Sequence, residues 1–182
     1  MCDIAAFLLM YFVEEEAFWT LVKITSDPRF DMAGRWVDGF PKLRRAMFVH
    51  NKLLEQHMPK VAKLLVKHSI GPSFYTMKWY LRMYVDVLDY DTTLRIWDVL
   101  LNEGTDILFA VSLVLMAHAE ADLLSKSDEM EIMALLQSLD TIPKGTTPQS
   151  FMEEVKEFKL DRKQITKWEK QYDANPPNKS EL

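Results

Sequence analysis

The residues of this chain best suited to acid–base or metal chemistry are its four histidines, His50, His57, His68 and His118. No two of them stand four residues apart, which is the helical spacing that presents two imidazoles to one zinc ion. A metal site built from them is a disfavoured alternative. We expect His50, His57 and His68 to be surface groups on a pair of basic helices. His118 lies in a mostly apolar stretch, so we expect a core histidine there.

Signatures of other enzyme classes are missing as well. The sequence contains no glycine-rich phosphate loop and no GxGxxG pattern. Cys2 is the single cysteine, so the chain forms neither an internal disulfide nor a cysteine-based zinc site. We therefore predict no catalytic residue, no metal and no cofactor in this chain.

Cationic side chains gather between residues 42 and 67. The basic band consists of Arg44 and Arg45 with Lys42, Lys52, Lys60, Lys63 and Lys67. One interpretation is a solvated helical face. The other is a surface that meets an acidic partner or anionic lipid, and charge spacing alone does not separate the two.

A second charged feature is the pair Arg95 and Asp98, three residues apart in the segment RIWD. A local pair of this kind on a helix surface contributes only about 0.2–0.5 kcal/mol. Its place between apolar aromatic residues raises a second interpretation, a partly buried ion pair that orients neighbouring helices. Both interpretations give the pair a structural role.

The composition is that of a soluble globular protein with one domain. Of the 182 residues, 48% are apolar and 27% are charged, so the chain is able to bury a core and keep a polar surface. The formal net charge of −5 provides no electrostatic footprint for nucleic acid.

Two apolar stretches bear on localisation. Residues 2–13 resemble a signal-peptide core, yet no basic segment precedes them and three glutamates follow directly. Residues 107–119 are too few to span a bilayer, so we expect a buried helix there. The sequence favours a cytoplasmic protein.

The elements that position these residues are organised around residues 73–104. The stretch reads as two consecutive helices, the first apolar nearly all round and the second a short amphipathic helix that ends at Gly104. We expect Trp79, Trp97 and Phe74 inside, because buried aromatic side chains dominate core energetics. Few glycines and many Leu, Met, Lys and Glu residues predict an all-α fold.

Apolar spacing predicts further helices. They cover residues 3–12, 14–24, about 41–54, 60–68, 106–124, 128–139 and 148–158, with helical spacing continuing over 165–172. The expected inward stripe of the second consists of Ala17, Phe18, Leu21, Val22 and Ile24. The expected N-caps are Asp91, Ser127 and Thr147. Residues 175–182 are polar and contain prolines, which predicts disorder.

Several segments, taken in order, resemble the C-terminal half of the TBC domain, the all-helical domain of Rab GTPase-activating proteins. The resemblance covers most of residues 1 to about 120. It is carried by MCDIAAFLLM at 1–10, ExAFW at 15–19, GFPxL at 39–43, SFYTMKW at 73–79, LRIWD at 94–98 and EG at 103–104. Each segment alone is weak, whereas six in the same order are a strong signal.

The resemblance implies an irregular all-α helical bundle like the C-terminal lobe of a TBC domain. It assigns residues 1–160 to the C-terminal part of a Rab GTPase-activating domain and leaves 161–182 as a charged extension, partly helical and then disordered. The implied partner is a Rab-type small GTPase in its GTP-bound form, with no nucleic acid and with membrane contact only through the GTPase. The implied setting is vesicle trafficking, in the cytoplasm or peripherally on endomembranes.

The resemblance also implies a mechanism whose reactive groups are missing from the sequence. A TBC domain lends its Rab an arginine from an IxxDxxR motif and a glutamine from a YxQGM motif. Arginines supplied in trans accelerate GTP hydrolysis by about 10³–10⁵-fold. Met1 aligns with the methionine that closes YxQGM, and IxxDxxR occurs nowhere in the chain. Arg95 is no substitute, because its motif position is structural. We therefore expect a regulator that is not itself an enzyme and is inactive alone.

The first predicted helix is apolar on every side and has no cap before it, as if preceding helices covered it. We expect a fragment of a full activator rather than a short natural product. The expected function is the C-terminal portion of a Rab GTPase activator. The alternatives are a non-catalytic GTPase-binding or scaffolding module and an unrelated helical adaptor.

The resemblance places the expected partner contact at Tyr75, Lys78 and Trp79, and then at Arg44 and Arg45 of the basic band. The competing interpretation is core packing for Trp79 and solvation for Lys78. The residues that carry the family motifs in a structural role are Trp19, Arg95, Trp97, Asp98 and Gly104.

Overall fold

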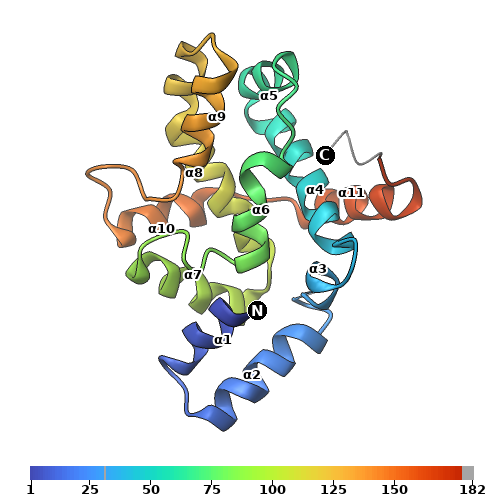
Figure 1. Ribbon diagram of the computed structural model, residues 1–182, viewed down its shortest axis with the longest axis vertical. Coiled ribbons are helices and arrows are strands. Elements are labelled where there is room, and N and C mark those ends of the chain that lie inside the picture. Colours follow the sequence, from blue (N-terminus) through green and yellow to red (C-terminus); the bar gives the residue numbers. More distant parts are fainter. Residues whose placement is uncertain (31, 178–182) are drawn as a thin grey trace.

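The computed structural model describes residues 1–30 and 32–177, and in those residues it contains helices and no strand. The all-α prediction is confirmed (Figure 1). The helices are α1 Cys2–Leu9, α2 Glu14–Ser26, α3 Ala33–Trp36, α4 Pro41–His57, α5 Pro59–Lys67, α6 Ser73–Arg82, α7 Tyr90–Glu103, α8 Asp106–Ser125, α9 Glu129–Gln137, α10 Pro148–Glu157 and α11 Arg162–Ala174.

Helix α8 forms the centre of the core. Its consecutive residues from Leu108 to Met116 are all buried, and it packs against α4, α5, α6, α7 and α10. By length and composition alone this helix could cross a membrane, and it is longer than the predicted apolar run. Its most apolar 18-residue window is 67% buried inside the protein, so the expectation of a buried helix holds.

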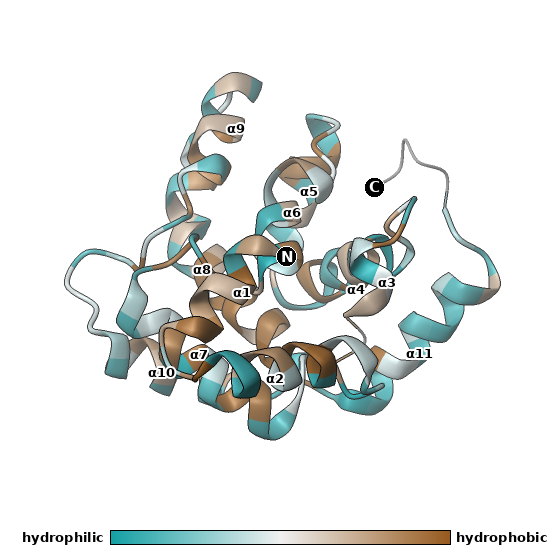
Figure 2. Cartoon of the chain, turned by 60° about the horizontal axis from the view of Figure 1, so that its bottom comes forward, coloured by the Kyte–Doolittle hydropathy of each residue, from teal (hydrophilic) through white to brown (hydrophobic). Residues whose placement is uncertain are grey.

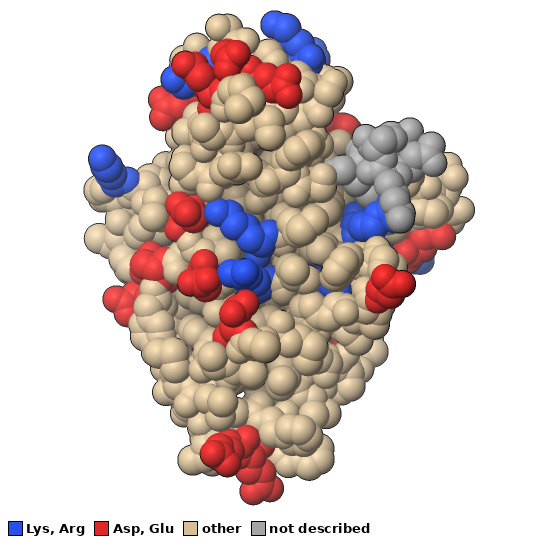
Figure 3. Space-filling view, in the orientation of Figure 1, with Lys and Arg blue, Asp and Glu red and all other residues tan. Residues whose placement is uncertain are grey.

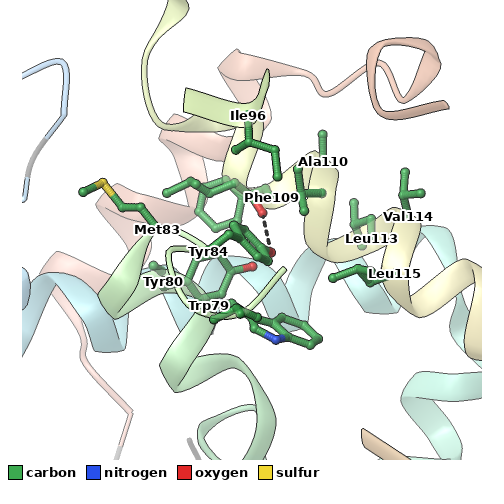
Figure 4. Close-up of a cluster of buried hydrophobic side chains, with 14 of the residues drawn as sticks. Trp79, Tyr80, Met83, Tyr84, Ile96, Phe109, Ala110, Leu113, Val114 and Leu115 are labelled. Atoms are coloured by element: carbon green, nitrogen blue, oxygen red, sulfur yellow. Dashed lines mark hydrogen bonds between the residues drawn. The ribbon is translucent and has the colours of Figure 1, made fainter. Parts of the chain in front are cut away.

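An aromatic cluster from α6, α7 and the turn between them packs on α8. Trp79 and Trp97 are 0% and 2% exposed, and Figure 4 shows Trp79, Tyr80 and Tyr84 gathered beside Phe109. The hydroxyl groups of Tyr80 and Tyr84 donate to Ser112 and to the Leu108 carbonyl, whereas the buried indole nitrogen of Trp79 has no hydrogen-bond partner among the described residues. The indole of Trp97 donates to the carbonyl of Met83 over 3.0 Å. Burial of both tryptophans in one interior agrees with the sequence prediction.

The connection from α6 to α7 is unusually bent. Met83, Tyr84 and Asp86 all have positive φ angles of 50–64°, a conformation that costs a non-glycine residue about 1 kcal/mol or more. The bend turns Met83 and Tyr84 into the core, where both are 0% exposed. Burial of these large side chains offsets the backbone strain.

Two of the three predicted helix caps are wrong by one or two residues. Asp89, and not Asp91, caps α7 by accepting from the Thr92 amide over 3.0 Å. Asp128, and not Ser127, caps α9 by accepting from the Glu131 amide over 3.1 Å. In both cases several adjacent polar residues can serve as the cap, and apolar spacing does not choose among them. Thr147 is confirmed, with a full capping box in α10.

Helix α2 is less buried than predicted. Ala17 and Ile24 are buried, but Phe18 is 58% exposed, so its place in the inward stripe is wrong. The physical reason is that α2 has only α1 and α3 as substantial neighbours, which cover one narrow face. Figure 2 brings forward the apolar segments of α1 and α2 on this side. Phe74 of α6, also predicted inside, is likewise exposed.

Helix α11 packs along α4 (Figure 1). Its Ile165 and Tyr172 are buried, and the ring of Tyr172 lies 5.6 Å from that of Phe48. Asp161 caps the helix by accepting from the Lys163 amide. The charged segment is therefore joined to the main core as far as Ala174. Of the tail predicted to be disordered, residues 178–182 lie outside the described part of the chain.

Candidate functional site

A surface groove of about 550 Å³ runs between α6 and α9. Its lining consists of Ser73, Phe74, Tyr75, Met77, Lys78, Leu81, Arg82 and Gln137. Phe74, Met77 and Leu81 follow the i, i+3, i+7 spacing of one helical face. On this face Phe74 and Met77 are exposed, and Leu81 is partly buried against the core. In this groove, exposed apolar side chains lie beside cationic ones.

Two of the residues expected to contact a partner, Tyr75 and Trp79, lie on the buried side of α6. Tyr75 and Trp79 are 2% and 0% exposed, so neither presents its side chain to a docking protein. They belong to the buried face of α6, which packs against α4 and α8. Core packing is therefore the correct interpretation for Trp79. Phe74 and Met77 were missed, because exposed and buried apolar residues alternate too closely along this helix for sequence patterns to separate them.

Lys78 lies on the exposed side and connects the two walls of the groove. Its ammonium group donates to the carbonyl of Gln137 over 3.1 Å and lies 3.8 Å from the carboxylate of Asp140. The contact to Gln137 holds the end of α9 beside α6. Lys78 is therefore neither buried nor simply solvated.

Arg82 lies at the lower end of the same groove. Its guanidinium is 3.0 Å from the carboxylate of Asp86 and 3.4 Å from that of Asp3, in the first turn of α1. Figure 3 shows cationic side chains in the middle of this face, bordered by acidic ones. Among the described residues that line the groove there are two cations and no carboxylate.

A second hollow of about 480 Å³ lies beyond Arg82, between α1, the bent turn and the start of α7. Its lining includes Asp3, Phe7, Met10, Asp86 and Tyr90. The rings of Tyr90 and Tyr11 stack at its edge, with their hydroxyl groups in contact. The two hollows therefore have opposite charge, cationic between α6 and α9 and acidic beside α1.

Helix α11 covers one part of the basic band and leaves another part exposed. Arg45 is paired with Asp173 over 2.9 Å and with Glu169 over 3.8 Å, and its side chain is only 13% exposed. Arg44 is half-buried on the same helix. Helix α11 thus covers Arg45, and the exposed remainder of the band is on α5, at Lys60, Lys63 and Lys67.

The expectation of a surface position for His50 is wrong, because it is 0% exposed. Its Nδ1 lies 2.8 Å from the Tyr80 hydroxyl and 3.1 Å from that of Ser112, while Nε2 lies 3.1 Å from the Tyr75 hydroxyl. Burial lowers the pKa of His50 to about 3, so the ring is neutral at pH 7. Its spacing from Leu43 and Leu54 is the signal that would have placed it inward.

The prediction that His118 is a core histidine is also wrong. This residue is exposed on α8, and its Nε2 contacts the carboxylate of Glu154 on α10. The buried surface of α8 is continuous only as far as Met116, so the side chains that follow reach the edge of the core. His57 is exposed, as expected, and His68 is partly buried. Within residues 1–30 and 32–177, no three potential metal ligands cluster.

The motif residues of α7 have structural roles, in contacts with neighbouring segments and in ending the helix. Arg95 and Asp98 are both exposed, so the partly buried ion pair is wrong; Arg95 donates instead to the Gln149 side chain over 2.9 Å. Gly104 ends α7 with φ = 103°, and an added Cβ would lie 3.4 Å from the carbonyl of Arg29. Trp19 is 59% exposed, with its ring edge-on to Phe18.

Comparisons with known proteins agree with the motif resemblance. The model of the Rab-GTPase-TBC domain matches residues 1–124. Carabin of Mus musculus is 34% identical over 152 residues, which are 84% of this chain and 33% of Carabin. TBC1 domain family member 10A of Mus musculus is 30% identical over 165 residues, 89% of this chain and 32% of that protein. The chain thus spans about a third of the length of these relatives.

Proposed function

Because the chain belongs to the Rab-GTPase-TBC domain family, we propose that it is the C-terminal portion of a GTPase-activating protein for Rab-type small GTPases. In this proposal the chain supplies core and contact surface, while the arginine and glutamine that act on GTP are not among its residues. The GTPase binds in its GTP-loaded form. Membrane contact is indirect, through the GTPase, in the cytoplasm or on endomembranes.

The observation that supports this proposal is the match of the Rab-GTPase-TBC domain model to residues 1–124. Asp3 in the first turn of α1 lies 3.4 Å from Arg82, at the junction of the two surface hollows. In this proposal the α6–α9 groove and the hollow beside α1 form the surface that contacts the GTPase.

A non-catalytic GTPase-binding or scaffolding module is the second candidate. It is favoured by the absence of an IxxDxxR arginine from the sequence, since binding needs no such group. The two candidates share the same contact surface. They differ in whether a chain extended through a YxQ segment and an IxxDxxR segment accelerates hydrolysis.

Single-turnover GTP hydrolysis by a panel of Rab GTPases tests the proposal. We expect residues 1–182 to leave the hydrolysis rate of every Rab unchanged, and a chain extended through both motifs to accelerate at least one. Robust stimulation by residues 1–182 alone would refute the assignment of the reactive groups. No stimulation by the extended chain, combined with binding, would favour the scaffolding module.

A further inference from the structure

We propose that this chain binds its GTPase at the α6–α9 groove. In this proposal the groove receives an apolar side chain of the GTPase that has a carboxylate beside it. This inference rests on the proposed function and adds to it a residue-level docking site and the chemistry of its occupant.

The apolar part of the argument comes from the exposed face of α6. Phe74 is 55% exposed and Met77 is 46% exposed, and Leu81 continues the same line at the groove wall. An exposed aromatic ring next to a methionine is a typical anchor site, because the ring offers a large apolar area and the thioether adapts to the shape of its partner. The occupant must therefore bring an apolar side chain.

The charge of the walls specifies the rest of the occupant. Lys78 and Arg82 line the groove. Their carboxylate partners, which are Asp140 for Lys78 and both Asp86 and Asp3 for Arg82, lie outside its lining. A carboxylate on the occupant would meet both cations, whereas an ammonium or guanidinium group would be repelled. The neighbouring hollow has Asp3 and Asp86 in its walls, so the same carboxylate would be disfavoured there. Charge complementarity thus selects the α6–α9 groove.

The groove is also held in shape before anything binds. Tyr75 belongs to the groove lining, and its hydroxyl group lies 3.1 Å from His50 in the core. Lys78 fixes the α9 wall through the Gln137 carbonyl. The start of α6 is tied by the Thr76 hydroxyl, which donates to the carbonyl of Pro72 over 2.8 Å. A preformed site avoids much of the ordering cost of association.

Equilibrium binding of residues 1–182 to GTP-analogue-loaded Rab proteins tests the inference. The variant Phe74→Ala/Met77→Ala removes the apolar anchor without touching the core, since both side chains are exposed. The matched control, Val66→Ala/Met130→Ala, removes exposed apolar side chains on α5 and α9 outside the groove lining. We expect the groove variant to raise the Kd about ten-fold or more and the control to leave it within about two-fold.

The charge requirement has its own variant. Lys78→Gln keeps a hydrogen-bond donor for the Gln137 carbonyl and removes the positive charge. We expect it to weaken binding and to flatten the salt dependence of the Kd, because one ion pair across the interface is lost. Equal salt dependence in wild type and Lys78→Gln would overturn the carboxylate assignment.

The outcomes separate the two proposals. Wild-type binding that is lost in the groove variant and kept in the control supports the docking site. Wild-type binding that is the same in the groove variant, or weakened equally by the control, overturns the docking site and leaves the proposed function standing. Failure of the wild-type chain to bind any Rab counts against the proposed function itself.

Discussion

His50 joins three helices through a polar network in the middle of an apolar core. Its ring reaches Tyr75 and Tyr80 of α6 and Ser112 of α8. Burial raises the pKa values of Tyr75 and Tyr80 above the ordinary value, so both hydroxyl groups stay protonated and available as donors. Because every ring nitrogen has a partner, the network places α4, α6 and α8 in one arrangement.

The first prediction concerns the pH dependence of stability. Unfolded His50 takes up a proton below its ordinary pKa of 6.5, whereas the folded chain resists protonation until about pH 3. Protons therefore favour unfolding, and the stability contribution is complete above pH 6.5 and declines as pH falls. Relative to His50→Gln, wild type should lose about 2 kcal/mol of unfolding free energy between pH 7 and pH 5. Urea unfolding of wild type and His50→Gln at pH 7 and pH 5 measures these free energies. Equal losses of unfolding free energy in the two proteins would contradict the prediction.

A second prediction at this scale tests the assignment of the α7 cap. Asp89→Ala removes the acceptor of the Thr92 amide and should lower the unfolding free energy by about 1 kcal/mol. Asp91→Ala, two residues along, removes only a charge near the helix start and should cost about 0.3–0.5 kcal/mol. Urea titrations of both variants show which of the two aspartates is the cap of α7. A larger cost at Asp91 would restore the cap expected from sequence.

At the scale of elements, α11 is a structural part of the molecule. Ile165 is 0% exposed, and Arg45 pairs with Asp173 across the contact with α4. Ile165→Ala should lower the unfolding free energy by about 2–5 kcal/mol, through lost burial and a residual cavity. The control Lys167→Ala, at an exposed position of the same helix, should change it by less than about 0.5 kcal/mol. Guanidinium unfolding compares the two; equal small effects would show that α11 contributes little.

Sequence patterns predicted the helices of this fold well, because amphipathic spacing repeats over several turns in α4 and α7 and because α8 is a long, continuously apolar segment. They failed where burial depends on how many neighbours a helix has. Phe18 and Phe74 look apolar and inward in sequence, yet each sits on a helix with one open face. The exposed groove residues could not be predicted for the same reason, since nothing local distinguishes Met77 from a buried methionine.

At the scale of the whole molecule, one surface carries the proposed contact for the GTPase. The face with α6 in its middle carries two hollows of opposite charge, separated by Arg82 and adjoining the first turn of α1. The motif resemblance anticipated the family. It did not anticipate which side of α6 faces outward.

The most direct test of the central claim is whether residues 1–182 distinguish the two nucleotide states of a Rab. Equilibrium binding is measured to the same Rab loaded with a non-hydrolysable GTP analogue and with GDP. We predict measurable binding to the GTP-like form of at least one Rab and at least about ten-fold weaker binding to its GDP form. Equal affinity for both forms, or no binding across the panel, would contradict a role for this chain as the contact surface of a GTPase activator.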